Sequence, residues 1–312
     1  MGCQPEDLMD IPASSLADLS AKQGEEVTLE SVAGRNQRMM TKQIDQNNLQ
    51  ILKNQLEKQR DIARLNSLGL PFAGAWLVSA PVVSLGLHLQ PHEFVLALKY
   101  RLGMAIYDRE GPCPACLRPS DRFGDHALCC GFWGERITRH NLLRDHLYDL
   151  AASACLSPIK EGRFLLPGAD RRPADVLLPS WEGGRDAALD VTVVNSLQEA
   201  MVEDSATRPG SALDKAYDRK MRGAAEDCLA QGIVFLPLAA EALGGWHEMA
   251  VNKVKKLASA VARQTGQEEG EVVHHAFTRL SMLLQRGNSA ILGNRIPSHA
   301  AAFTDGVEEG DG

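Results

Sequence analysis

Four cysteines and one histidine lie close together near the middle of the sequence. Cys113 and Cys116 are separated by two residues, His126 follows after nine more, and Cys129 and Cys130 come soon after it. Two thiolates at this spacing can hold one zinc ion, and a more distant histidine and cysteine can complete a tetrahedron. We therefore predict a closed, structural zinc site made by Cys113, Cys116, His126 and one of the two adjacent cysteines, with Cys130 favoured over Cys129.

Two aspartates, Asp175 and Asp190, interrupt apolar segments that predict strands. Fourteen residues separate them, with the turn-forming pair Gly183–Gly184 in between. A hairpin of this length can place the two carboxylates side by side, where they would hold a hard divalent ion such as Mg²⁺. Such an ion can activate water and stabilise the charge that develops on a phosphodiester. The alternative is that both aspartates lie at strand ends or on a solvated face.

Basic residues flank this pair along the chain. Arg139 and His140 stand at the expected start of a helix over 141–155, and helix N-termini attract anions, so both residues are candidates for contacting a phosphate. Lys215 and Lys220 lie on the helix expected after the second aspartate, where an ammonium would orient water or neutralise a phosphate. The alternatives are a solvated helix start and a solvated helix face with lysine–aspartate pairs.

Composition limits the class of protein. The 312 residues include 44% hydrophobic and 23% charged residues, which excludes a disordered chain. The formal net charge of −7 excludes a uniformly basic nucleic-acid coat, so any nucleic-acid contact must be local. We find neither an apolar run of roughly 18 residues nor a secretory signal, and the seven cysteines are odd in number. These features predict an intracellular, reduced protein.

The order of elements predicts an α/β fold, with a small mixed sheet flanked by helices and an inserted zinc knuckle. We expect a loose or helical segment over 1–64, a helical linker with the knuckle over 65–136, the main domain over 137–298, and a disordered tail over 299–312. Strands are expected at 163–167, 174–178, 187–194 and 232–238. Helices are expected at 36–64, 91–101, 141–155, 211–230, 247–264 and 269–286.

Taken in order, these motifs resemble the restriction-like endonuclease domain of site-specific non-LTR retrotransposons. The resemblance covers roughly 65–298 and rests on the Cys-Cys-His-Cys knuckle, Arg139-His140-Asn141, Arg172-Pro173-Ala174-Asp175, Asp190 and the lysine-bearing helix. It implies a PD-(D/E)xK-like core, Mg²⁺-dependent DNA cleavage and structural zinc. It also implies that Arg139, His140 and Arg172 contact DNA, in the nucleus, with the RNA of a retroelement as a further candidate partner.

The sequence departs from the family pattern at two points. Proline and aspartate are separated by Ala174, and Thr192 stands where the strand lysine is usual, which makes Lys220 or Lys215 the candidate replacement. No Tyr-x-Asp-Asp sequence of a reverse transcriptase occurs, so we expect a piece separated from that enzyme. Two rival hypotheses remain. One is a catalytically inactive nucleic-acid-binding module, and the other is a zinc-braced interaction protein that uses the helix over 36–64.

Overall fold

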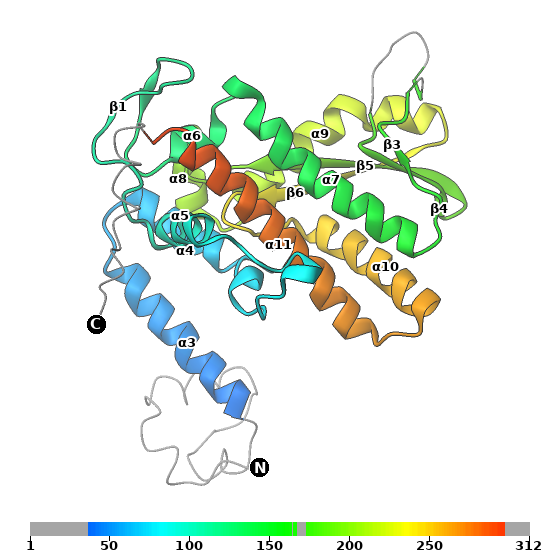
Figure 1. Ribbon diagram of the computed structural model, residues 1–312, viewed down its shortest axis with the longest axis horizontal. Helices are drawn as coiled ribbons and strands as arrows, with labels where there is room; N and C mark the ends of the chain where they lie inside the picture. The colour runs from blue at the N-terminus through cyan, green and yellow to red at the C-terminus, as the bar shows by residue number, and fades with distance from the viewer. Residues whose placement is uncertain (1–36, 164, 167–172, 297–312) are drawn as a thin grey trace, which may run out of the picture. The chain divides into compact units, whose positions relative to one another are not determined.

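The computed structural model describes residues 37–163, 165–166 and 173–296 (Figure 1). Arg172, most of the segment expected to be loose at the N-terminus, and the tail over 299–312 lie outside the described residues. Contacts between residues divide the chain into two units, 1–58 and 59–312. The knuckle and the expected main domain therefore belong to the same unit.

The first unit contains helix α3 (Gln37–Asn54). The single helix expected over 36–64 is therefore interrupted. It stops at Asn54, and a separate helix, α4 (Gln59–Leu68), begins in the second unit. Residues 55–58 contain neither glycine nor proline, so nothing in the pattern marked this break.

The second unit combines one mixed sheet with helices and a small two-stranded hairpin. Its strands are β1 (Gly111–Pro112), β2 (Pro119–Ser120), β3 (Ile159–Lys160), β4 (Val176–Glu182), β5 (Arg185–Val194) and β6 (Val234–Glu241). Its α-helices after α4 are α5 (Pro91–Leu102), α6 (Asp125–Cys129), α7 (Glu135–Ser153), α8 (Val202–Thr207), α9 (Ser211–Ala230), α10 (Glu248–Thr265) and α11 (Glu269–Gly293). Short 3₁₀ turns are η2 (Ala75–Leu77), η3 (Val83–Leu85) and η4 (Phe132–Gly134).

The main sheet has the strand order β3-β4-β5-β6. The first three strands are antiparallel, whereas β6 runs parallel to β5 and is reached through α8 and α9. Apolar side chains on one face pack against α7, α10 and α11, and those on the other face pack against α9 (Figure 1). The predicted mixed sheet flanked by helices is confirmed.

The β4–β5 hairpin forms because of its two glycines. Gly183 and Gly184 both have positive φ, at 62° and 79°, and they connect Glu182 to its partner Arg185. A two-residue loop with positive φ at both positions matches the right-handed twist of the strands. Beyond the turn a bulge shifts the register before regular pairing resumes at Leu178.

Two expected elements differ from the structure. Arg163, Leu165 and Leu166 lie outside any strand, and the edge position beside β4 is taken by β3, whose Ile159 pairs with Leu177. Leu166 is still buried, because it packs on the apolar cluster between the sheet and α9. Helix α7 begins at Glu135, earlier than expected, after Gly134 in the left-handed conformation.

A second apolar cluster joins α4, α5, α6 and α11. It contains Tyr100, Leu128 and Leu292, and it places the knuckle helix α6 against the end of α11. The fourth predicted strand, now β6, is buried along almost its whole length, as its apolar sequence indicated. None of the helices in the described ranges is both long and apolar enough to cross a membrane.

A buried acid at the end of β6 gives a prediction for stability. Glu241 is 1% exposed, and burial raises the pKa of its carboxyl to about 7, although Ser67 and Ser196 partly oppose the shift. The unfolded chain releases this proton near pH 4.5, whereas the folded chain keeps it until about pH 7. As the pH rises from 4.5 to 7, the free energy of unfolding should therefore decrease by on the order of 3 kcal/mol.

Glu241→Gln should remove this pH dependence. Urea denaturation of both proteins at several pH values between 4.5 and 8 measures the difference, and all other titrating groups cancel in the comparison. Parallel curves for the two proteins would show that Glu241 does not titrate in this range.

Candidate functional site

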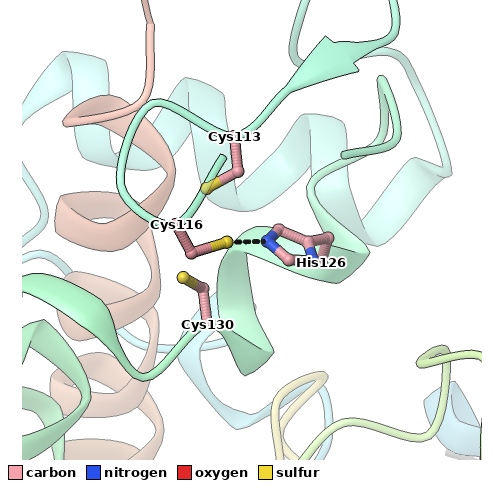
Figure 2. Close-up of side chains that lie close together, drawn as sticks. All are labelled: Cys113, Cys116, His126 and Cys130. Carbon is pink, nitrogen blue, oxygen red and sulfur yellow. Dashed lines mark hydrogen bonds between the residues drawn. The ribbon is translucent and has the colours of Figure 1, made fainter. Parts of the chain in front are cut away.

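The four predicted zinc ligands come together beside the β1–β2 hairpin (Figure 2). Cys113 and Cys116 belong to the loop between the two strands, His126 lies on α6, and Cys130 is the residue at the C-terminal end of α6. Their ligand atoms all lie within 4.8 Å of one another, and Cys116 Sγ is 3.2 Å from His126 Nε2. Three thiols and an imidazole at these distances are compatible with a structural zinc ion.

The knuckle is shaped by its own loop and by α11. The Asp121 carboxylate accepts hydrogen bonds from the backbone N–H groups of Asp125, at 3.0 Å, and His126, at 2.7 Å. These bonds satisfy donors that the first turn of α6 would otherwise leave free. Gly124 has a φ of 93°, and a Cβ there would lie 2.3 Å from Leu292 Cδ2. A glycine therefore lets the helix carrying His126 approach α11 closely.

The cysteines differ in ionisation. Burial alone would raise the pKa of Cys113, but hydrogen bonds from the backbone N–H groups of Cys116 and Ala115 outweigh it and lower the pKa to about 6. Burial raises the pKa of Cys129 to about 11. Cys129 therefore stays a neutral thiol at neutral pH, while Cys130 is the member of the pair that lies in the cluster, as the sequence favoured.

Asp175 and Asp190 occupy neighbouring positions of the β4–β5 hairpin. Val176 pairs with Leu189, so the next position along the ladder brings Asp175 opposite Asp190. One Asp175 oxygen accepts the backbone N–H of Val191 at 2.6 Å, and the other lies 3.0 Å from His140 Nε2 on α7. The side chain of Asp175 thus satisfies a backbone donor of β5 just where β4 no longer pairs with it.

Only one of the two candidate lysines reaches this pair of acids. Lys220 Nζ, on α9, lies 2.8 Å from Asp190 Oδ2. Lys215, on the same helix, is exposed and forms an ion pair with Asp204 of α8 instead. Five residues along an α-helix correspond to a rotation of about 140°, so the two ammonium groups face different directions. The structure therefore distinguishes the two lysines that the sequence left as alternatives.

The acids and their partners meet at a free edge of the sheet. Pairing of β4 with β5 ends at Leu189, and a hollow of about 350 Å³ lies at the uncovered part of β5. Among the residues that line this hollow are Gly131, Arg136, Ile137, His140, Thr192 and Lys220. His140 on α7 and Lys220 on α9 reach it from opposite faces of the sheet, because among the described residues no strand pairs with β5 on that side beyond Leu189.

The Asp190 carboxyl is buried close to that of Asp175. Asp190 is 8% exposed; burial raises the pKa of its carboxyl and the nearby Asp175 carboxylate adds to the rise, although Lys220 opposes both. A carboxylate that is buried beside a like charge is stabilised by any additional positive charge. Within the described ranges, however, only the cysteine cluster brings three or more histidine, cysteine or acidic side chains close enough to hold a metal ion by themselves.

Arg139, a candidate for contacting a phosphate, is almost fully buried, and it is one of the residues that line the hollow at β5. It is 3% exposed, and its guanidinium donates to Asn288 Oδ1 at 2.8 Å and to the carbonyl of Leu128 at 3.5 Å. The reason is that α7 begins at Glu135, which puts Arg139 one turn inside the helix and against α11. Gly287 allows this close approach, since a Cβ there would lie 2.6 Å from Arg139 Cγ.

A larger hollow lies elsewhere, between the knuckle and residues 197–200, with a volume of about 980 Å³. Its lining includes Glu110, Asp121, Asp125 and Glu199. Acidic walls repel a phosphodiester backbone. We therefore place the candidate active site around Lys220, which lines both the hollow of about 350 Å³ and a second hollow of about 230 Å³ whose lining includes Asp190 and Arg219.

Sequence reasoning missed two contacts. It predicted neither the contact of His140 with Asp175 nor the bond between Arg139 and Asn288. The partners of these bonds are 35 and 149 residues apart. A pairing over such a separation leaves no periodic signal in a single sequence.

The cysteine cluster makes a specific prediction about zinc. The purified protein should contain one zinc ion per chain, and Cys130→Ser should lose it together with on the order of 5 kcal/mol of stability, because a structural metal contributes directly to folding. Cys129→Ser is the matched control and should keep the metal. Elemental analysis and thermal unfolding measure both effects; loss of zinc from the Cys129 variant alone would contradict the assignment.

Comparison with known proteins identifies no relative of this chain. No family model matches the chain, and no curated protein matches it. The candidate site is therefore defined by its own geometry, which comprises a Cys₃His cluster and, at the free edge of β5, an Asp175–His140 pair beside an Asp190–Lys220 pair.

Proposed function

We propose that this protein is a Mg²⁺-dependent DNA endonuclease of retroelement origin, with a restriction-like core of the PD-(D/E)xK type. The observation that carries the proposal is the meeting of Asp175, Asp190, His140 and Lys220 at one open sheet edge. These are the residues whose types and order resemble the non-LTR retrotransposon nuclease. A nuclease of this kind would act on DNA in the nucleus.

The two carboxylates fit Mg²⁺, although the described part of the chain contains no tight group of three acidic ligands. Mg²⁺ usually keeps several water molecules and binds through one or two carboxylates together with substrate phosphates. Asp175 and Asp190 would supply those carboxylates. Burial, and after it the Asp175 charge, raises the pKa of Asp190, and a bound cation would offset both effects. When bound, the ion would supply an activated water and stabilise negative charge on the phosphate.

Lys220 and His140 have separate tasks in this proposal. The Lys220 ammonium lines the hollow, where it would stabilise the charge that builds on the scissile phosphate. His140 holds Asp175 in place through a 3.0 Å contact. Thr192 lies two residues beyond Asp190 and lines the same hollow as Lys220. This shared lining supports Lys220 as the proposed replacement for the strand lysine.

Nicking of supercoiled DNA in the presence of Mg²⁺ tests the proposal. Asp175→Asn and Asp190→Asn should each slow nicking by about 10²- to 10³-fold, because several kcal/mol of transition-state stabilisation is lost. Lys220→Met should slow it by about 10²-fold. Lys215→Met removes a lysine from the same helix without touching the acids, and its nicking rate should stay within about twofold of the wild type.

Two results would overturn this assignment. One is nicking that persists in both aspartate variants, since a contaminating nuclease would then be responsible. The other is equal loss of activity in the Lys215 and Lys220 variants, since the loss would then reflect the charge of α9 rather than the site. Circular dichroism of each variant verifies that the fold is retained.

A second function remains in competition, a nucleic-acid-binding module without catalysis. The observation that favours it is that both carboxylates already have cationic or N–H partners within the protein, namely His140, Val191 and Lys220. This alternative predicts gel-shift binding that needs no divalent ion, with no cleavage under Mg²⁺ or Mn²⁺.

A further inference from the structure

Two aromatic side chains are exposed beside the candidate active site. Phe132 and Trp133, in η4, are 56% and 55% exposed. They follow the zinc ligand Cys130 and precede α7, on which His140 lies. Large aromatic side chains are ordinarily buried in a core. Two adjacent exposed rings therefore indicate a surface that binds a ligand.

The backbone keeps the indole of Trp133 in this position. Trp133 has φ 66° and ψ 1°, a left-handed conformation that disfavours residues other than glycine. Such strain persists where the surroundings hold it, and it tends to gather at functional sites. Gly131 stands two residues before Trp133, and Gly134 directly after it also has positive φ, at 73°. The turn is therefore built so that Trp133 projects away from the core.

A fixed arginine supports one side of the ring. The guanidinium carbon of Arg295 lies 5.4 Å from the centroid of Trp133. Arg295 is itself buried, forms an ion pair with Glu135 and donates to the carbonyl of Ile291 at 2.7 Å. A cation over an indole is a favourable contact. The ring is thus oriented before any ligand arrives.

The aromatic pair stands in the chain between residues that line the cationic hollow. Gly131 lies before the pair and Arg136 and Ile137 lie after it, and all three line the hollow that His140 and Lys220 also line. Arg136 is exposed and anchored by a 2.9 Å hydrogen bond to the carbonyl of Cys129. Exposed aromatic rings therefore lie within a few residues of positive charge, in a chain whose net charge is −7.

We propose that Phe132 and Trp133 stack on unpaired nucleobases of the DNA strand whose phosphate enters the hollow beside Lys220. This inference rests on the proposed function and names the form of its substrate. Aromatic rings beside a cationic groove are the means by which proteins hold single strands, because every base has a π face and every linkage a charge. In an intact duplex these faces are covered, so the site requires single-stranded or locally unpaired DNA.

Tryptophan fluorescence tests the inference directly. Trp76 and Trp246 are buried and Trp181 is only half-exposed, so Trp133 is the most exposed of the four tryptophans. The full chain is titrated, without Mg²⁺, with an oligothymidine strand and with the duplex of that strand with oligoadenosine. The single strand should quench the emission, whereas the duplex should quench it weakly. Trp133→Leu should abolish the quenching and weaken single-strand binding by about 5- to 100-fold.

Three controls make the result decisive. Trp133→Phe keeps a stacking ring and should retain most of the affinity, while Leu229→Ala, an exposed apolar change on α9, should leave it unchanged. Zinc content verifies that each variant keeps the knuckle. Equal quenching by the duplex, an affinity unaffected by Trp133→Leu, or no binding by the wild type would each overturn the inference. Quenching by a protein that cannot nick DNA would reject the nuclease and leave the stacking surface standing.

Discussion

The candidate site depends on the Asp175 carboxylate at the point where β4 stops pairing with β5. One of its oxygens accepts the Val191 N–H, the other contacts His140, and its own backbone N–H donates to the Leu189 carbonyl at 2.9 Å. A buried strand N–H without a partner is unfavourable, so the carboxylate takes over the role of the missing strand. This substitution leaves the edge of β5 open, and the open edge is what lets groups from both faces of the sheet meet.

The zinc knuckle and this site are mechanically joined. Arg139 bonds to the carbonyl of Leu128 in the knuckle helix and to Asn288 on α11, and the next residue is His140. Arg139 can approach α11 closely because Gly287 has no side chain. Burial lowers the pKa of Arg139 to about 10, yet the group remains charged at neutral pH. A cation buried at this position is costly unless its hydrogen bonds hold, so the knuckle fixes the position of the helix that carries His140.

Local patterns were predictable from the sequence, whereas long-range partners were not. The Gly183–Gly184 turn predicts the β4–β5 hairpin, and the bulge between Leu178 and Glu182 then shifts its register so that Asp175 comes opposite Asp190. The knuckle ligands were likewise recognisable from spacing. The choice between Lys215 and Lys220 was not, because it depends on how α9 is rotated against the sheet. The burial of Arg139 was not predictable either, because α7 begins at Glu135, which puts Arg139 inside the helix rather than at its N-terminus.

The pairing of Lys220 with Asp190 also links the charge state of the site to its ligands. While Asp190 has no other cation, its carboxylate holds the ammonium at 2.8 Å, and the pKa of Asp190 is still raised because burial and Asp175 outweigh this contact. If a second positive charge satisfies the two carboxylates, Lys220 no longer needs to neutralise Asp190. Its flexible side chain can then turn toward an anion in the hollow that it lines. Binding of a cation and of a phosphate at this edge should therefore be cooperative. A cation on the two carboxylates frees the Lys220 ammonium for the phosphate, and a phosphate that attracts the ammonium leaves the carboxylates to the cation.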